Sequence, residues 1–455
     1  MTELSNEQIE LAFAEINPAL SQAEAVFEAN RCLYCYDAPC TRACPTHIDV
    51  PSFIKKIASG NLTGAARVIF DANPIGASCA RVCPVEVLCE GACVEKTLMD
   101  APIQIGRLQR YATDYATQKG KQIFSKGESN GKSVGIIGSG PAGLSCATYL
   151  ARLGYDVTIY ERKPLAGGLD TYGMAEYKMP QKTSLDEVKL VENLGVKFEL
   201  NCEIVVMSEP PALAGERKAR LVKLFANAND SDLLSNHDAI FLAVGLGETN
   251  KLNIEGEDLD GVIDALHFIE QIKTRDWKSV PLGRTVAVIG AGNTAIDAVT
   301  QAKRLGAERV LMIYRRTEKD MSAYAYEYEL AKKDGIEFMW QTTPMTISGN
   351  GKVEKLLCKK ADGSEFEIPC EMVIKAIGQQ KQVGFLQSLG IETDEKQRVA
   401  VDENMQTSNP QIFAGGDCVN GGAEAVDASQ TGKLAAQGIH FSLTGESIKL
   451  AGAIL

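Results

Sequence analysis

A glycine-rich turn between two apolar runs constrains the fold of this chain more than any other stretch. Residues 134–137 form a short apolar run, and Gly138, Gly140 and Gly143 follow in a G-x-G-x-x-G pattern. In a strand–turn–helix–strand unit, the first glycine permits a sharp turn, the second lets the backbone approach a pyrophosphate, and the third lets helix and strand pack closely. The next apolar run ends at Glu161, where an acid can bind a ribose hydroxyl. The pattern therefore predicts a dinucleotide-binding unit.

Length and composition limit the alternatives. The 455 residues exceed one ordinary domain, so we expect two or three domains. A hydrophobic content of 45%, with 41 glycines, is typical of a globular α/β protein. The net charge of −12 gives no electrostatic reason to bind nucleic acid or an anionic membrane. No apolar run approaches the roughly 18 residues of a membrane span, and the acidic first residues do not resemble a signal peptide, so we expect a cytoplasmic protein.

Eight of the thirteen cysteines form two groups near the N-terminus. In a cytoplasmic chain such groups indicate metal or redox chemistry rather than disulfides. The Cys-Pro pairs favour two [4Fe-4S] clusters, with zinc sites or inert thiols as the alternatives. In ferredoxin-like runs the cysteine before proline binds the other cluster, so one cysteine is expected to leave each group. The groups are Cys32-x2-Cys35-x4-Cys40-x3-Cys44-Pro45 and Cys79-x3-Cys83-Pro84, the latter followed by Cys89-x3-Cys93.

The apolar spacing around these cysteines predicts short helices. Two are expected between Gln8 and Asn30, with a break near Pro18, and others over 51–60, 62–72 and 105–115. The remaining cysteines are scattered along the chain, and we expect them to be packing residues. They are Cys146, Cys202, Cys358, Cys370 and Cys418.

Several stretches of this module resemble the N-terminal half of dihydropyrimidine dehydrogenase, most closely the bacterial form in which the electron-input half is a separate subunit. The small subunit of glutamate synthase shares the same plan, and the resemblance extends along essentially the whole chain. The stretches that carry it are residues 31–40, 44–46, 64–70, 73–76 and 105–113.

The resemblance implies a ligand set for each cluster. The first set is Cys32, Cys35, Cys40 and Cys93, and the second is Cys44, Cys83, Cys89 and the side chain of Gln109. Cys79 remains an alternative fourth ligand of the second cluster, and a solvated helical side chain is the alternative for Gln109. Glutamate synthase relatives tend to have glutamate in place of Gln109, so this residue favours the pyrimidine enzyme.

The same resemblance assigns FAD to the first dinucleotide unit. It implies that Gly168 and Leu169 lie against the flavin. A buried strand is expected over 238–245, and a closing strand runs into Gly416 and Asp417. Asp417 is implied to bind the ribityl chain, and the helix that follows is implied to point its N-terminus at the isoalloxazine ring.

A second β-turn-α unit begins at residue 285, with alanine at the position of the third glycine, where it is tolerated. The strand after it ends in Arg315 and Arg316 instead of an acid. Two guanidinium groups can bind a 2′-phosphate, so NADP(H) is favoured over NAD(H); an exposed basic pair is the alternative. The expected nucleotide-binding residues of this turn are Gly290, Gly292, Asn293 and Thr294.

Two dinucleotide units, the second nested inside the first, predict an α/β chain: an N-terminal helical iron–sulfur domain and a glutathione-reductase-like flavoprotein. The expected domains are 1–125 with two [4Fe-4S] clusters, 126–250 and 376–455 for FAD, and 251–375 for NAD(P).

The expected activity is that of an NAD(P)-dependent oxidoreductase in which the cofactors do the chemistry, and no catalytic side chain is assigned. Neither nucleotide domain contains C-x-x-C, so a disulfide reductase would lack its redox pair. No second flavin site follows, so we expect a partner subunit to take the electrons, and the resemblance implies a partner that carries FMN and reduces uracil or thymine. The alternatives are a glutamate synthase small subunit with a large glutamine-dependent partner, and a non-catalytic adaptor.

Overall fold

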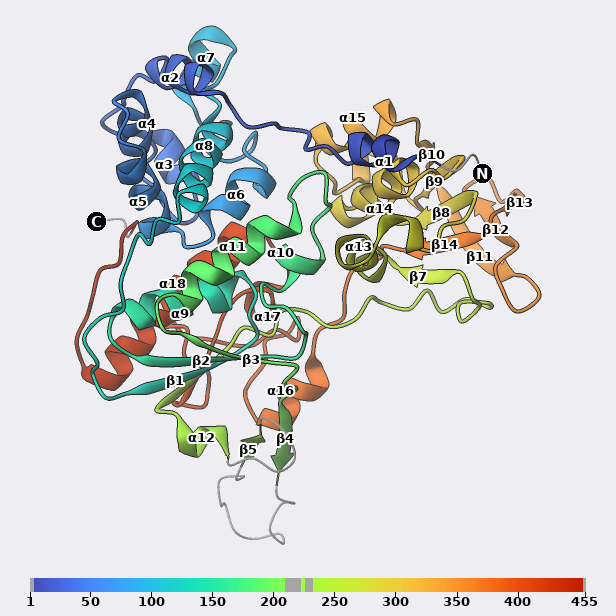
Figure 1. Ribbon diagram of the computed structural model, residues 1–455. Helices are drawn as coiled ribbons and strands as arrows, with labels where there is room; N and C mark the ends of the chain where they lie inside the picture. The colour runs from blue at the N-terminus through green and yellow to red at the C-terminus, as the bar shows by residue number, and fades with distance from the viewer. Residues whose placement is uncertain (1–3, 209–221, 226–231, 453–455) are drawn as a thin grey trace, which may run out of the picture. The chain divides into compact units, whose positions relative to one another are not determined.

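The computed structural model describes residues 4–208, 222–225 and 232–452, which form two compact units. One unit contains residues 4–16, Tyr172–Gln181 and Gly247–Gln380. The other contains Asn17–Thr171 and the described parts of 182–246 and 381–455. The chain therefore passes between the units several times, as its colours in Figure 1 show. No helix of the described residues is long and apolar enough to cross a membrane.

The second unit opens with a helical module built around the buried side chains of Phe53, Ile54, Ile69 and Leu108. The helices expected there are confirmed, with small shifts at their ends. Capping boxes at Ser5 and Ser21 begin the first two helices of the chain. The helices are α1 (Asn6–Ala12), which lies in the other unit, and α2 (Gln22–Asn30), α3 (Pro39–Ala43), α4 (Val50–Ala58), α5 (Leu62–Ala72), α6 (Gly76–Val82), α7 (Val94–Met99) and α8 (Ile105–Gln118).

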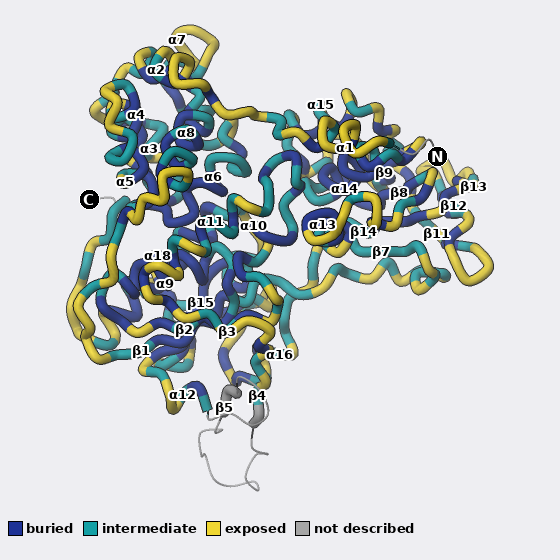
Figure 2. The backbone as a smooth tube through the Cα atoms, viewed as in Figure 1, coloured by how far each residue is buried: buried dark blue, intermediate teal, exposed yellow. Residues whose placement is uncertain are grey.

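The rest of this unit is a parallel sheet with strand order β15-β6-β1-β2-β3. Its strands are β1 (Ser133–Ile137), β2 (Asp156–Glu161), β3 (Lys197–Leu200), β6 (Ala239–Leu242) and β15 (Ile412–Ala414). Every residue of β6 and β15 is buried, and Figure 2 shows dark blue segments around the label of β15. The other elements are α9 (Pro141–Arg152), α10 (Leu169–Tyr172), α11 (Gln181–Glu192), β4 (Val205–Ser208), β5 (Val222–Phe225), α12 (Leu233–Asn236), α16 (Val383–Leu389), α17 (Asp417–Asn420) and α18 (Ala425–Thr444).

The first unit contains a second parallel sheet, with order β10-β9-β8-β14-β7, nested in sequence between β6 and β15. A three-stranded antiparallel sheet, β11-β12-β13, was not among the expected elements. The elements are β7 (Val262–Asp264), α13 (Ala265–Thr274), β8 (Thr285–Ile289), α14 (Asn293–Arg304), β9 (Arg309–Ile313), α15 (Ala325–Lys333), β10 (Glu337–Met339), β11 (Thr342–Ser348), β12 (Lys355–Lys360), β13 (Glu365–Pro369) and β14 (Met372–Lys375), with two 3-10 turns, Trp277–Ser279 and Glu318–Asp320.

The segment Tyr172–Gln181 belongs to this nucleotide unit although it follows the flavin turn in sequence. Buried ionic contacts hold it there. The Lys178 ammonium lies 2.6 Å from a carboxylate oxygen of Asp297 in α14 and 2.5 Å from one of Glu327 in α15. The ammonium of Lys273 in α13 donates a hydrogen bond to the Met179 carbonyl and forms an ion pair with the Glu176 carboxylate, both at 2.8 Å.

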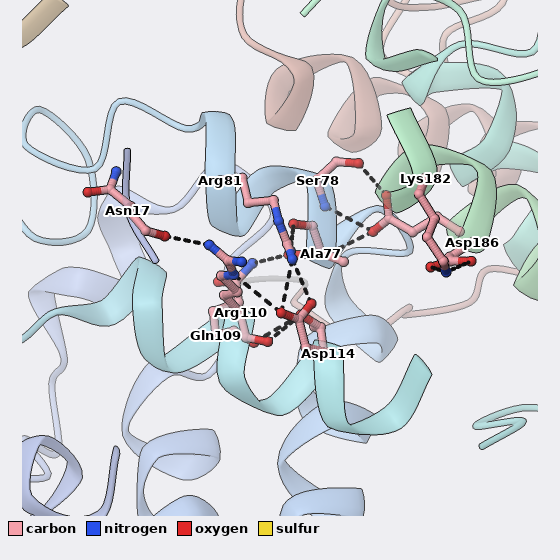
Figure 3. Close-up of polar contacts among 12 residues, drawn as sticks. Asn17, Ala77, Ser78, Arg81, Gln109, Arg110, Asp114, Lys182 and Asp186 are labelled. Atoms are coloured by element: carbon pink, nitrogen blue, oxygen red, sulfur yellow. Dashed lines mark hydrogen bonds and ion pairs between the residues drawn. The ribbon is translucent and has the colours of Figure 1, made fainter. Parts of the chain in front are cut away.

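In the other unit, buried polar contacts join the helical module to the flavin fold. Glu187 of α11 accepts hydrogen bonds from the backbone amides of Ala77 and Ser78, at 2.7 and 3.2 Å, and from the Ser78 hydroxyl. Figure 3 shows Ala77 and Ser78 of α6 facing the helix that carries Asp186. Burial raises the pKa of Glu187 to about 8; the hydrogen bond from Ser78 opposes this rise and the nearby Asp170 adds to it.

We expect Glu187→Gln to remove part of the pH dependence of stability. Because the pKa of Glu187 is raised on folding, the folded protein keeps a proton that the unfolded chain releases. The free energy of unfolding should therefore fall as pH rises from 4.5, the ordinary pKa of a glutamate, to about 8, by up to about 1.4 kcal/mol per pH unit. Urea unfolding across this pH range measures the slope, which should be shallower in the variant.

The control is Glu192→Gln, at an exposed position in the same helix, which should keep the wild-type slope. An identical pH dependence in wild type and Glu187→Gln would contradict a raised pKa at this residue.

Candidate functional site

The turn between β1 and α9 is shaped by its three glycines. Gly138 has a φ of 100°, and a Cβ there would lie 2.4 Å from the Ala243 carbonyl oxygen. A Cβ at Gly143 would lie 2.1 Å from the Gly138 oxygen, so helix and turn pack backbone to backbone. At Gly140, which caps α9, the nearest atom to a Cβ is Gly168 Cα, at 3.9 Å. The backbone at this helix N-terminus is open, as a phosphate requires.

Glu161 ends β2 and is buried, with its carboxylate held in place. Ser139 donates to one oxygen from its amide at 3.1 Å and its hydroxyl at 2.6 Å, and the Lys163 amide donates to the other at 2.9 Å. A carboxylate offers about four acceptor sites, so these three bonds leave room for a ribose hydroxyl. The structure therefore places Glu161 beside the glycine turn in an orientation compatible with a ribose contact.

Two other expected flavin contacts lie on turns of the same unit. Gly168 has a φ of 57°, and a Cβ there would lie 2.7 Å from Gly140 Cα, so only a glycine fits against the turn. Leu169, next to it, is partly exposed at the start of α10. At the end of β15, the Gly416 amide donates to Thr431 Oγ1 at 2.7 Å.

Asp417 begins α17, and its carboxyl is largely buried. Burial raises its pKa, although a hydrogen bond from the Ala423 amide and the nearby Lys381 act in the opposite direction. A buried acid beside the open glycine backbone is a suitable partner for a polyhydroxylated ligand. These features fit a bound FAD.

The second turn repeats the plan of the first. Gly290 has a φ of 135°, and a Cβ there would lie 2.1 Å from the Ala376 oxygen. Gly292 caps α14, and the nearest atom to a Cβ there is Ser322 Oγ at 3.4 Å. Asn293 accepts a hydrogen bond from the Tyr324 amide at 3.1 Å, and Thr294 follows it, half-buried, in the first turn of the helix. The arrangement fits a second nucleotide.

Arg315 and Arg316 follow β9 after one intervening residue, Tyr314, and both are exposed. The Arg316 carbonyl accepts a hydrogen bond from the Gln341 amide at 2.9 Å, which fixes the backbone. Within the described part of the chain, neither guanidinium group makes an ion pair or a hydrogen bond. Both are therefore available to an anion at the end of this strand.

The structure brings together the four cysteines expected to bind the first cluster, Cys32, Cys35, Cys40 and Cys93. Burial raises the pKa of Cys40 to about 12, and the neighbouring Cys93 and Cys32 add to the rise. Burial likewise raises the pKa of Cys32, on which Cys35 and Cys93 act in the same direction. Cys35 and Cys93 thus act on Cys32, and Cys32 and Cys93 act on Cys40, so the four thiols lie near one another and form a donor set suited to a [4Fe-4S] cluster.

The three cysteines of the second set, Cys44, Cys83 and Cys89, also lie near one another. The pKa of Cys83 is raised well above its usual value by a hydrogen bond with Cys79, by burial, and by the neighbouring Cys44 and Cys89. Burial and the same neighbour, Cys44, raise the pKa of Cys89. Cys79 is itself buried, and its pKa is raised: side-chain hydrogen bonds with Cys83 and Asn73 lower it, but burial and the nearby Asp170 and Glu187 outweigh them. The geometry keeps Cys79 next to the set.

Gln109 lies on α8 and is 7% exposed, so it is not a solvated side chain. Its Nε2 donates to the carbonyl of Gly76, the first residue of α6, at 2.7 Å. This bond engages the amide nitrogen, so the amide oxygen is the atom of this side chain that could bind a metal. Asp114 fixes the helix pair, because it accepts bonds from Arg81 of α6 at 2.8 and 2.9 Å and from Arg110 of α8 at 3.2 Å (Figure 3).

The described residues hold no group of three or more His, Cys, Asp or Glu side chains close enough to hold a single metal ion. In a four-iron cluster each thiolate binds a different iron, so its ligands lie farther apart than those of one ion. The five scattered cysteines are all buried, as expected of packing residues.

Family models and curated relatives match both parts of the chain. Residues 132–432 match the pyridine nucleotide-disulphide oxidoreductase family, and residues 9–121 match dihydropyrimidine dehydrogenase domain II, 4Fe-4S cluster. The glutamate synthase [NADPH] small chain of Escherichia coli K12 is 34% identical over 94% of this chain and 93% of its own length. The NAD-dependent dihydropyrimidine dehydrogenase subunit PreT of the same strain is 34% identical over 95% of this chain and 97% of its own length.

Among solved structures, thioredoxin reductase from Lactococcus lactis aligns with a TM-score of 0.56 and 25% identity, over 69% of this chain and 100% of that chain. The expected fold class is thereby confirmed for the flavoprotein part, and the iron–sulfur family match confirms it for the N-terminal part. The chain thus belongs to the family of FAD- and iron–sulfur-dependent oxidoreductase subunits that includes glutamate synthase small chains and the dihydropyrimidine dehydrogenase subunit PreT.

Proposed function

We propose that this chain is the electron-input subunit of a dihydropyrimidine dehydrogenase, and that it passes electrons between NAD(P)H and a partner subunit that carries FMN and reduces uracil or thymine. The observation that carries the proposal is Gln109, a neutral amide buried where a helix meets the second cysteine group. The similarity to the two named relatives is equal, at 34% identity, so it does not favour either.

The residues of the chain have binding and positioning roles in this proposal. When bound, FAD accepts hydride from the nicotinamide and releases single electrons to the clusters. The open backbone at Gly140 would hold the FAD pyrophosphate, Glu161 the ribose and Asp417 the ribityl chain. The first cluster would take Cys32, Cys35, Cys40 and Cys93; the second would take Cys44, Cys83, Cys89 and Gln109.

NADP(H) is the proposed nicotinamide nucleotide, because Arg315 and Arg316 stand exposed where an NAD-specific site would have an acid. A guanidinium group binds a phosphate through paired, charge-assisted hydrogen bonds. The pair would therefore contact the 2′-phosphate that distinguishes NADP(H) from NAD(H).

Replacing Arg315 and Arg316 together by alanine should weaken the use of NADPH far more than that of NADH. The loss in kcat/KM for NADPH should correspond to about 1–3 kcal/mol, the range for lost hydrogen bonds to charged groups. Steady-state reduction of a dye with each nucleotide measures it. Arg309→Ala, at the opposite end of the same strand, is the matched control and should keep the wild-type preference. An equal loss with both nucleotides would refute the assignment.

We infer a partner subunit because the electrons that reach the iron–sulfur clusters need an acceptor. A glutamate synthase small subunit is the second candidate, because the Escherichia coli glutamate synthase small chain is as similar to this chain as the pyrimidine enzyme's subunit is, at 34% identity. In that case the partner would be a large glutamine-dependent subunit.

The isolated chain should reduce dyes with NAD(P)H but should not turn over pyrimidines, because it is proposed to depend on a second flavin in the partner. Adding an FMN-containing dihydropyrimidine dehydrogenase subunit should give uracil-dependent oxidation of the nucleotide. Adding a glutamate synthase large subunit is the matched comparison and should give no glutamine-dependent oxidation. Activity only with the large subunit would establish the second candidate, and pyrimidine turnover by the chain alone would contradict both.

The ligand set makes its own prediction. Wild-type protein should contain about eight irons per chain, from two four-iron clusters. Cys79→Ser should leave the iron content unchanged, whereas Cys83→Ser should lose about half of it. Gln109→Cys should keep the iron and shift a cluster potential, because a thiolate adds negative charge. Iron analysis with redox titration tests this, and loss of half the iron in a folded Cys79→Ser protein would assign the fourth ligand to Cys79.

A further inference from the structure

Lys433 is a buried cation in the helix that follows the expected flavin strand. It lies in α18, is 2% exposed, and is among the largest fully buried side chains of the described residues. Its ammonium donates to the carbonyls of Thr46 in the helical module and of Ala451 near the end of the described chain, both at 3.0 Å. The ring of Tyr149 lies 5.9 Å away. The side chain thus spans from the flavin fold into the cysteine module.

No carboxylate in the described chain forms an ion pair with this ammonium. The carboxylate that acts on it electrostatically, Asp71, is already paired with Arg152 at 2.6 Å. Burial lowers the pKa of Lys433 to about 8, and the negative charge of Cys44 and of Asp71 acts against this effect. Two carbonyl dipoles do not neutralise a buried charge, and such a charge is costly unless a counter-charge faces it. The site therefore requires an anion that the protein carboxylates do not supply.

Cys44 marks where that anion would be. Its sulfur lies 3.4 Å from the hydroxyl of Thr46, whose carbonyl accepts the Lys433 bond, so one short turn carries both contacts. Cys44 also acts electrostatically on Cys83 and Cys89. A four-iron cluster bound by three thiolates and one neutral amide carries a net negative charge, and reduction of the cluster makes that charge more negative.

We propose that Lys433 is a positioning residue that supplies the positive counter-charge of the second iron–sulfur cluster and thereby raises its reduction potential. This inference rests on the ligand set proposed above. A fixed positive charge stabilises the reduced, more negative cluster more than the oxidised one, so it favours entry of an electron. Lys433 belongs to α18 of the flavin fold, so a residue of the flavin fold would influence the reduction potential of the cluster.

Lys433→Met, which keeps the length of the side chain without its charge, tests the proposal. The holoprotein should keep the wild-type iron content, and one of its two cluster signals should appear at a lower potential in a redox titration monitored by EPR. The shift should fall on the same signal that Gln109→Cys shifts. Lys433→Arg, which keeps the charge, should lie closer to wild type than Lys433→Met does.

Lys273→Met is the matched control, because Lys273 is a buried lysine of the nucleotide unit. It should leave both cluster potentials unchanged. If the Lys433→Met protein loses iron, the redox titration is made with Lys433→Gln instead. The glutamine amide is neutral but can still donate to the carbonyls. Loss of iron in both neutral variants but not in Lys433→Arg would also support the need for a positive charge.

Unchanged potentials in an iron-replete Lys433→Met protein would overturn the proposal, and so would a shift confined to the other cluster signal. Loss of iron in all three variants, Lys433→Arg included, would show that the site needs the shape of lysine rather than its charge. A wild-type protein without about eight irons or without NAD(P)H-dependent dye reduction would instead contradict the proposed function.

Discussion

A seam of buried hydrogen bonds joins the helical module to the flavin fold, and the arrangement of the two proposed cofactor sites depends on it. Glu187 binds the first turn of α6, and the hydroxyl of Ser429 in α18 donates to Asn73 at 2.8 Å just before it. These groups are buried, so removing one partner while the seam stays closed would leave the other unsatisfied, at a cost of about 1–3 kcal/mol each. A redox chain needs its cofactors at fixed separations, and this seam supplies them through protein contacts.

Glycine turns and cysteine spacing predicted most of the fold because each has a strong local cause. The turn at Gly138 needs a positive φ and a close carbonyl, and both are present. The helices over 50–58 and 62–72 follow from apolar periodicity and begin at Asp49 and Asn61, whose side chains accept bonds from the helix amides. The sequence predicts whether a segment is a helix or a strand wherever its apolar periodicity, caps and turn residues agree.

The antiparallel sheet β11-β12-β13 was missed because its strands carry paired charges instead of a clear apolar alternation. Lys355 contacts Glu367 across neighbouring strands, a pairing that exists only once the strands are in register. The seam at Glu187 and the cation at Lys433 were also beyond prediction, because each depends on residues far apart in sequence. The ligand groups were predictable as types, but the burial of Gln109 and the contact between Cys79 and Cys83 required coordinates.

The segment Tyr172–Gln181 has a consequence for how such proteins can be recombined. It is encoded within the flavin half, yet Lys178 and its two carboxylates fasten it into the nucleotide unit. A chimaera that exchanged only the continuous stretch Gly247–Gln380 for that of a relative would leave behind ten residues that belong to the exchanged part. It would leave Lys178 buried without Asp297 and Glu327, which are removed with the exchanged stretch, so a workable graft must carry two separate pieces of the gene.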